Sequence, residues 1–348
     1  MDVGLKIINK PTEEQLQFAK QLGVEKLVIE LPEIPGDGYW EFLDLLRLKE
    51  RIESEGLDLI AIENMPREWY EKIRLGLEGK DEQIENIRKT ITNMGKAGIN
   101  MFGYDWMLVG VWRTGIHRGR GGALVDVFDY DAVREAPLPL RDSFGRKLIT
   151  EGEKTEREIT EGELWSNYQH FLEKVLPAAE QAGVKMALHP DDPPVSPLAE
   201  TSRIFTNLEA LEKAMSLVDS DFHCLEFCQG TIAEMGVDIP NAIRRFGSRG
   251  KIGYVHFRNI RGTVPKFEQP FIDEGDVDMA ECIQAYREVN FEGILLPDHA
   301  PDLTGDTPWL DREKAGNISW YELVGGFRSK GYATGYIKGL LSATDKRD

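Results

Sequence analysis

The sequence predicts a single (β/α)8 barrel that spans residues 1–348, with insertions after the fourth and the seventh strand. Short apolar runs rich in β-branched side chains alternate with longer amphipathic runs, as in proteins whose parallel strands are covered by helices. Eight short runs are present, the number of strands in a closed α/β barrel, although alternation by itself is also compatible with a doubly wound sheet. The expected strands are Val3–Ile8, Lys26–Glu30, Leu57–Ile62, Ile99–Trp106, Val184–His189, His223–Phe227, Ile252–Phe257 and Ile294–Pro297.

Helices are expected between the strands wherever apolar residues recur three and four positions apart. This spacing occurs in residues 81–97, 161–181 and 207–218. Three expected helices begin with a capping box, in which a threonine is followed three residues later by Gln or Glu. The pairs are Thr12 with Gln15, Thr160 with Glu163, and Thr206 with Glu209. Asp278 is expected to cap a further helix that starts directly after it.

Two long connections interrupt this alternation. Residues 107–160 include a Gly/Arg-rich run at 118–122 (RGRGG) and show no clear helical period. Because structureless connections of this length are usually functional, we expect a lid over the site, and His117 can enter the site with it. A second long connection, residues 259–277, follows the seventh strand.

The composition excludes several classes of partner. The formal net charge is −18, which repels nucleic-acid backbones and anionic membranes, so an anionic substrate would need a locally basic site. The chain has three cysteines, a low and odd number that argues against a disulfide framework and indicates a reducing cytoplasm. Neither a signal peptide nor an apolar stretch long enough to span a bilayer is visible. The seven tryptophans and the long loops are compatible with a homo-oligomer.

Four side chains that can bind a metal ion stand at or just after the ends of four consecutive expected strands. They are His189, Cys228, His256 and Asp298. In a barrel the carboxyl ends of the strands meet at one mouth, where the active sites of this fold lie. Two imidazoles, a thiolate and a carboxylate suit a divalent ion, with zinc or iron preferred by the thiolate over magnesium. A closed set of four would make a structural zinc site, whereas a catalytic site leaves coordination room for substrate.

Each of these residues also has a purely structural interpretation. A single histidine at a strand end is more often a hydrogen-bonded structural residue than a ligand, and Cys228 on its own would more often be a buried apolar thiol. The joint pattern favours metal binding for the four together. We expect the structural role for Cys224 and Cys282, and packing or surface roles for His170 and His223.

A basic group is expected beside the metal. Arg258 lies two residues after His256, so on a strand both side chains point to one face. Arg258 and Asn259 would then line the mouth, and a guanidinium there suits a carboxylate or a polyhydroxyl substrate. A salt bridge from Arg258 to a neighbouring strand fits the spacing equally well.

Acidic and acid–base groups follow two of the expected ligands. The proline-rich segment 190–194 holds Asp191 and Asp192 near the metal, where they can orient a ligand imidazole. His299 directly follows Asp298 and is a candidate general acid or base.

Five short motifs of the C-terminal half resemble those of the mannonate dehydratase family, whose members have a xylose-isomerase-like barrel. They are residues 189–194 (HPDDPP), 227–231 (FCQGT), 255–259 (VHFRN), 275–279 (GDVDM) and 297–299 (PDH). They occur in the order found in the family, and residues 105–114 resemble the family's segment after the fourth strand. The combination is specific, although each motif alone would be weak.

The resemblance implies the dehydration of D-mannonate to 2-dehydro-3-deoxy-D-gluconate with Mn²⁺ or Fe²⁺ held by the four ligands above. It also matches His299 and Tyr321 to the family's catalytic histidine and tyrosine. The expected reaction is a metal-assisted β-elimination, in which one of these two residues takes the C2 proton and the other protonates the departing C3 hydroxyl. The residues expected to bind the substrate are Arg113, Asp192, Arg203, Arg258 and Asn259.

Two alternatives stay open at this point. One is a metal-dependent sugar isomerase or epimerase on the same barrel, against which the thiolate ligand and the pair of His299 and Tyr321 weigh. The other is a metal-binding homologue that has lost its catalytic activity.

Overall fold

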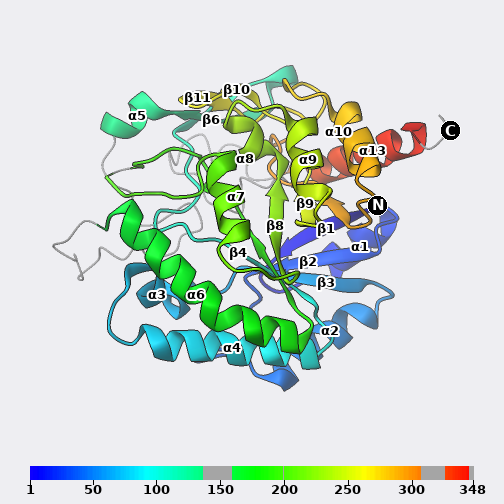
Figure 1. The fold of residues 1–348 in the computed structure, drawn as a ribbon. Coiled ribbons are helices and arrows are strands. Elements are labelled where there is room, and N and C mark those ends of the chain that lie inside the picture. The colour runs from blue at the N-terminus through cyan, green and yellow to red at the C-terminus, as the bar shows by residue number, and fades with distance from the viewer. Residues whose placement is uncertain (136–158, 199, 307–325, 345–348) are drawn as a thin grey trace.

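Eight parallel strands close into a barrel in a computed structural model that describes residues 1–135, 159–198, 200–306 and 326–344 (Figure 1). The strands follow one another around the barrel in the order β1-β12-β9-β8-β7-β4-β3-β2. Their bounds are β1 Asp2–Ile8, β2 Lys26–Glu30, β3 Asp58–Glu63, β4 Met101–Tyr104, β7 Lys185–Leu188, β8 His223–Cys228, β9 Ile252–His256 and β12 Ile294–Leu296. All eight expected strands are therefore confirmed, and the alternative of a doubly wound sheet is wrong.

Side chains of the barrel strands alternate between two buried layers, one inside the barrel and one under the helices. The inward-facing layer includes a small apolar cluster that strands on all sides of the barrel supply. Its members are Val28, Ala61, Ala187, Cys224, Tyr254, Ile294 and Leu296. The outward-facing side chains, such as Leu27, Phe102 and Leu225, join the large cluster under the surrounding helices. This two-sided burial explains why the strands read as almost continuous apolar runs.

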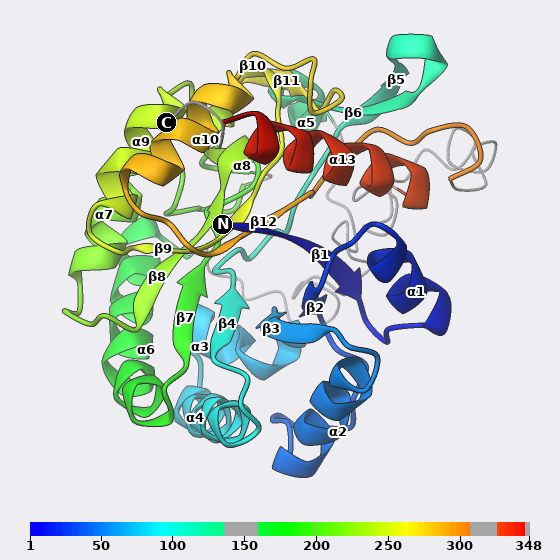
Figure 2. The ribbon, with the colours of Figure 1, turned by 90° about the vertical axis from the view of Figure 1, so that its right-hand side faces the viewer.

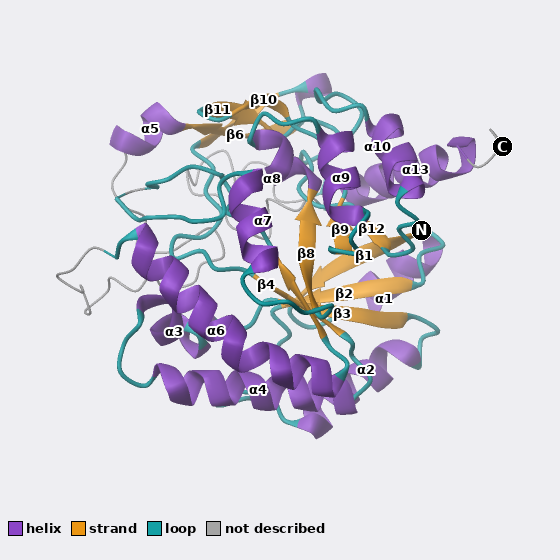
Figure 3. Cartoon of the chain, in the orientation of Figure 1, coloured by secondary structure: helices purple, strands orange, loops and turns teal. Residues whose placement is uncertain are grey.

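Helices surround the barrel (Figure 3). Their bounds are α1 Glu13–Gln21, α2 Phe42–Glu53, α3 Glu71–Leu75, α4 Lys80–Lys96, α6 Glu161–Ala182, α7 Leu208–Ser216, α8 Gln229–Glu234, α9 Ile239–Gly247, α10 Met279–Glu288 and α13 Phe327–Thr344. The three helices expected from apolar spacing correspond to α4, α6 and α7. In Figure 2, α13 lies between α1 and α10. No helix of the described segments is long and apolar enough to cross a membrane.

Two of the three expected capping boxes form. The side chains of Thr12 and Thr160 accept hydrogen bonds at the first turns of α1 and α6. The box expected at Thr206 is wrong, because Asn207 is the cap and its Oδ1 accepts from the backbone nitrogen of Ala210 at 2.8 Å. Asparagine is as effective a cap as threonine, so the helix begins one residue later. Asp278 caps α10, as expected.

The two insertions join in one antiparallel sheet of four strands, in the order β10-β11-β6-β5. The strands are β5 Gly115–Arg118, β6 Leu124–Asp129, β10 Arg261–Thr263 and β11 Lys266–Glu268. The sheet lies at the end of the barrel toward which β8 points (Figure 1), which is the end where the ligands were expected. The sequence shows the insertions separately but not their pairing, because three-residue strands carry too few residues for a period to appear.

The lid expected over residues 107–160 is described only in part. Its first half contributes β5, β6 and the short helix α5, Tyr130–Glu135, and residues 136–158 lie outside the described residues. His117 is exposed and lies 3.1 Å from Glu268 of β11. His117 thus belongs to the surface of the insertion sheet in this structure.

Candidate active site

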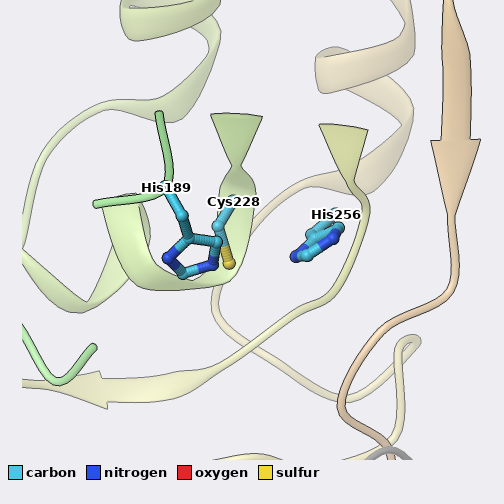
Figure 4. A group of neighbouring side chains, drawn as sticks. All are labelled: His189, Cys228 and His256. Carbon is cyan, nitrogen blue, oxygen red and sulfur yellow. The ribbon is translucent and has the colours of Figure 1, made fainter. Parts of the chain in front are cut away.

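Three of the four expected ligands meet at the mouth of the barrel (Figure 4). His189 directly follows β7, Cys228 ends β8 and His256 ends β9, and these strands are neighbours in the barrel. Each offers one ligand atom, and the three atoms lie within 4.8 Å of one another. Cys228 follows His189 by 39 positions (228 − 189) and precedes His256 by 28 positions (256 − 228). Adjacent parallel strands therefore bring together residues that are far apart in the chain.

Hydrogen bonds fix which nitrogen of each imidazole faces the other ligands. His189 Nδ1 lies 2.6 Å from the carbonyl oxygen of Pro190, so Nδ1 donates this hydrogen bond and Nε2 is the nitrogen left to bind a metal ion. His256 Nε2 lies 3.1 Å from Glu63 Oε2 and 3.2 Å from Glu226 Oε1. The Nδ1 atom of His256 is buried and, within the described chain, without a hydrogen-bond partner, which suits coordination to a metal.

Cys228 is prepared to act as a thiolate. Burial raises the pKa of its thiol, but the cations of Arg258 and His189 hold this pKa well below its usual range. The hydroxyl of Thr231 also donates to Cys228 Sγ at 3.0 Å. A thiolate and two imidazole nitrogens within 4.8 Å of one another form a donor set that fits a divalent transition-metal ion, which would replace the protons on these nitrogens.

Asp298, the expected fourth ligand, lies beside this group but is not within the compact set of three. Its Oδ2 is 3.5 Å from His256 Nδ1 and 3.2 Å from Arg258 Nε, and its Oδ1 is 3.2 Å from Lys6 Nζ. Burial raises the pKa of Asp298, but His256 and the neighbouring cations hold it well below its usual range. A ligating role for Asp298 therefore stays a prediction.

His299 is buried at the same mouth. Its Nδ1 lies 2.8 Å from the side-chain amide of Gln269, and its Nε2 lies 3.7 Å from Asp298 Oδ2. Burial, together with the cations of Arg258 and Arg113, holds the pKa of His299 well below its usual range, although the Asp298 carboxylate opposes this effect. The imidazole is therefore neutral, as a general base requires. Tyr321, the other expected catalytic residue, lies outside the described residues.

A network of buried ion pairs lies on the insertion side of the ligands. Asp192 pairs with Arg113 at 2.6 Å and with Arg258 at 2.8 Å, and Glu234 Oε1 lies 3.0 Å from Arg258 and 3.5 Å from Arg113. Gly230 leaves room for Arg258, because a Cβ there would collide with its guanidinium. Three of the expected substrate-binding residues, Arg113, Asp192 and Arg258, are thus bound to one another beside the candidate metal ligands.

The other two expected substrate-binding residues hold loops in place. Arg203 donates to the carbonyl oxygens of Pro193 at 3.0 Å and Gly110 at 2.8 Å, and it also contacts that of Val109. Asn259 donates to the carbonyl oxygen of Ile272 at 3.1 Å, and it both donates to and accepts from the backbone of Val277. These side chains fix the loops that carry the site. A direct contact of either side chain with the substrate stays a prediction.

A second polar cluster lies inside the barrel beneath His256, and the sequence interpretation missed it. Lys6 Nζ is 2.9 Å from Glu63 and 3.3 Å from Glu30, while the hydroxyl of Tyr254 donates to Glu226 at 2.6 Å. Glu63, Glu226 and His256 also place ligand atoms within 4.8 Å of one another. The available signal was the presence of charged residues within otherwise apolar strands, as in Leu225–Phe227, because a buried charge needs partners.

Glu63 and Glu226, the two glutamates of this cluster beside His256, have different charge states. Burial raises the pKa of Glu63, but Lys6 and His256 lower it to about 2. Burial and the charge of Glu63 raise the pKa of Glu226 to about 8. Gly103 of β4 makes room for both, since a Cβ at this position would collide with the Tyr254 hydroxyl and approach both carboxyl groups. Of these two carboxyl groups, only that of Glu63 is therefore an anion at neutral pH.

The remaining cysteines and histidines lie away from the ligands. Cys224 and Cys282 are buried and unpaired, as expected, and burial raises the pKa of both thiols. His223 is buried with Nε2 at 3.0 Å from the hydroxyl of Tyr104, and His170 is half-buried on α6 near Asp81. Packing and surface roles for these two histidines are confirmed.

Comparison with known proteins agrees with the geometry. The profile of the D-mannonate dehydratase (UxuA) family matches residues 8–347. The mannonate dehydratase of Thermotoga maritima is 33% identical over 350 residues, which cover 93% of this chain and 92% of that protein. Mannonate dehydratase 2 of Halalkalibacterium halodurans is 33% identical over 84% of this chain and 88% of its own length.

Solved structures show the same relationship. The crystal structure of mannonate dehydratase from Streptococcus suis serotype 2 is similar with a TM-score of 0.84 and 27% identity, covering 99% of this chain and 94% of that one. A structure of L-ribulose 3-epimerase shares the fold at a TM-score of 0.59 and 17% identity, covering 100% and 97% of the two chains. The chain therefore belongs to the D-mannonate dehydratase family, and it is a hydro-lyase.

Proposed function

We propose that this enzyme dehydrates D-mannonate to 2-dehydro-3-deoxy-D-gluconate. One observation supports the proposal most directly: the family match over residues 8–347 includes His189, Cys228 and His256, whose side chains meet at the barrel mouth. The rival reaction, sugar isomerisation or epimerisation, is supported by similarity of fold alone, since the epimerase structure shares only 17% identity.

The metal we propose is Mn²⁺ or Fe²⁺. His189, Cys228 and His256 would hold it, with Asp298 as the proposed fourth ligand. When bound, the ion supplies Lewis-acid stabilisation of the charge that develops on the carboxylate side of the substrate. Both ions accept more than four ligands, so the substrate can add its own oxygens to this set.

The residues of the chain would move the protons. One of His299 and Tyr321 removes the C2 proton, and the other donates a proton to the C3 hydroxyl, which leaves as water. The C2–H and C3–O bonds break, a C2=C3 double bond forms, and the resulting enol tautomerises to the 2-keto acid. The neutral imidazole of His299 is compatible with the role of base.

Arg258 and Arg113 are the proposed contacts of the substrate carboxylate and hydroxyls. The net charge of −18 repels an anionic substrate, so the site needs local positive charge, and these two arginines supply it. Asp192, which pairs with both, would position them. Asn259 and Arg203 would act from a greater distance, through the loops that they hold.

We also propose a role in hexuronate breakdown in the cytoplasm, with the whole chain acting as one catalytic domain. All three cysteines are unpaired, which a reducing compartment maintains. A small sugar acid is the proposed partner, and a homo-oligomer is compatible with the exposed aromatic and aliphatic residues Leu43, Phe327 and Tyr332.

The test is a substrate panel. Purified enzyme loaded with Mn²⁺ or Fe²⁺ is incubated with C6 aldonates, and with free aldoses and ketoses as the rival substrates, and 2-keto acid and isomerised sugar are both quantified. We expect 2-keto acid from D-mannonate. Isomerised sugar without 2-keto acid would establish the rival reaction, and metal binding without turnover on any aldonate would indicate an inactive homologue.

A matched variant connects the reaction with the site. His299→Asn should keep the metal and lower kcat by about 100-fold or more, because removal of a general base costs about 10²–10⁴ in rate. Wild-type turnover by this variant would remove His299 from the mechanism.

A further inference from the structure

Gln269 lies at the junction of the insertion sheet and the active site. It directly follows β11, is 1% exposed, and comes from the connection after the seventh barrel strand. Its side-chain amide lies among Arg113, Arg258 and His299, which three other segments of the chain supply. A single side chain therefore contacts both cations of the mouth and the candidate base.

The neighbouring cations decide the orientation of this amide. Guanidinium nitrogens can only donate hydrogen bonds, so the amide oxygen faces them, 3.0 Å from Arg113 Nε and 3.1 Å from Arg258 Nη1. The same oxygen lies 2.8 Å from His299 Nδ1. Because an amide oxygen only accepts, the hydrogen of the imidazole is on Nδ1, and in the neutral ring the lone pair is on Nε2.

We propose that Gln269 is a positioning residue for catalysis: it holds His299 in the Nδ1–H form and thereby makes Nε2 the atom that exchanges a proton with the substrate. This inference rests on the proposed function, because it takes His299 as an acid–base group of the dehydration. Gln269 itself acts only through His299 and the two arginines.

The insertion sheet places this oxygen. β11 pairs with β6 through Phe267 and Phe128, and the backbone nitrogen of Gln269 donates to Asp126 O at 2.9 Å. Side chains two residues apart on a strand share a face, so Phe267 and Gln269 both point to the site. The Arg113 guanidinium lies over the Phe267 ring, 5.0 Å from its centroid. The sheet therefore supports the catalytic centre from the side of the insertions.

The outward side of the same strand provides a control. Glu268, the residue before Gln269, points away and pairs with Arg261 of β10 and with His117 of β5. Glu268→Gln changes the charge of the sheet without touching the mouth, so it should leave kcat within about two-fold of wild type, as expected for an exposed ion pair.

The experiment compares three replacements of Gln269 in the full-length, metal-loaded enzyme. Gln269→Met keeps the length of the side chain and removes the acceptor, Gln269→Asn retracts the acceptor by one methylene, and Gln269→Glu keeps an acceptor at the same place. Kinetics give kcat and KM separately. Nitrogen-15 NMR of histidine-labelled, Zn²⁺-loaded protein reports the tautomer of His299, assigned by comparison with His299→Asn.

We expect Gln269→Met and Gln269→Asn to lower kcat by about 10–100-fold, as is typical when a residue that orients an imidazole is lost, with KM and metal content nearly unchanged. The Nδ1–H signal of His299 should be replaced by a mixture of tautomers. Gln269→Glu should keep this signal and recover most of the lost kcat. Recovery would separate an acceptor role from simple packing, because Met fills the same volume.

Two results would overturn the proposal. One is wild-type kcat in both Gln269→Met and Gln269→Asn, and the other is a His299 tautomer that is the same in all variants or is Nε2–H in the wild type. Should Gln269→Met fail to fold, Gln269→Asn and Gln269→Glu still decide between the outcomes. Absence of 2-keto acid formation by the wild type would contradict the proposed function instead, whereas the NMR result would still be valid for Gln269.

Discussion

Arg113 and Asp192 face each other in a two-pronged ion pair, with Nη1 2.6 Å from Oδ1 and Nη2 2.9 Å from Oδ2. Both side chains are almost completely buried, and they belong to the first insertion and to the loop after β7. Burial raises the pKa of Asp192, but Arg113 and Arg258 lower it far below its usual range. The Asp192 carboxylate, which both arginines share, offsets part of the charge of the two guanidiniums that lie buried beside the candidate ligands.

Asp192→Asn should destabilise the fold by about 3–5 kcal/mol, because it leaves two buried cations with one anion fewer. Urea unfolding followed by circular dichroism measures this change. The control is Glu288→Gln, which breaks the exposed pair of Arg244 and Glu288 and should leave the free energy of unfolding nearly unchanged. Equal stabilities of the two variants would contradict the assignment of Asp192 as the anion that both buried arginines share.

Cys228→Ser should lose most of its metal affinity, because a serine hydroxyl stays protonated where the Cys228 thiol is held as a thiolate. Titration with Mn²⁺, followed by electron paramagnetic resonance, gives the Kd, and Co²⁺-loaded wild type should show a sulfur-to-metal absorption band that the variant lacks. Cys282→Ala, on α10 and remote from the ligands, is the control. Full occupancy with an unchanged Co²⁺ spectrum would exclude Cys228 as a ligand.

Glu63→Gln should weaken Mn²⁺ binding by about 10–100-fold, the usual effect of losing a residue that orients a ligand histidine. The Glu63 carboxylate accepts from His256 Nε2 at 3.1 Å and thereby keeps Nδ1 available for the ion. An Mn²⁺ titration checks this prediction, with Glu288→Gln again as the control. A Kd equal to that of the wild type would show that His256 is oriented without Glu63.

His223 should make the fold sensitive to acid. Burial lowers its pKa to about 3, whereas the unfolded chain has a histidine pKa of about 6.5. Below pH 6.5 the unfolded state therefore binds a proton that the folded state excludes, so the free energy of unfolding falls as the pH decreases, by about 1.4 kcal/mol per pH unit down to pH 3. At higher pH the group contributes no pH dependence.

The measurement compares urea unfolding between pH 7 and pH 4 for wild type and His223→Gln, which retains an acceptor for the Tyr104 and Tyr168 hydroxyls. The variant should lose about 2 kcal/mol less than the wild type between pH 6.5 and pH 5. His117→Gln, at an exposed position, controls for the loss of an imidazole. Parallel pH profiles of His223→Gln and wild type would be evidence against a neutral, buried His223.

The eight strands could be predicted because each is buried on both faces, which leaves a local signature in the sequence. The same topology made His189, Cys228 and His256 predictable as a group, since neighbouring strand ends are neighbours in space. Glu63 and Gln269 could not be found in this way. In the sequence nothing distinguishes Glu63 from the other glutamates, and only the pairing of the barrel strands places it 3.1 Å from His256. Gln269 reaches the site only because the two insertions pair in one sheet.

The sequence by itself determined the barrel, the three candidate ligands that meet at its mouth and the family to which the chain belongs, because these depend on local patterns and on fixed motifs. The tertiary structure decided which side chains neutralise one another. Arg203 and Asn259 hold loops, while Arg113, Arg258 and Asp192 pair in the interior. Electrostatic and hydrogen-bond partners depend on distances of a few ångströms between segments that are remote in the chain, and the pattern of residues along the sequence does not specify those distances.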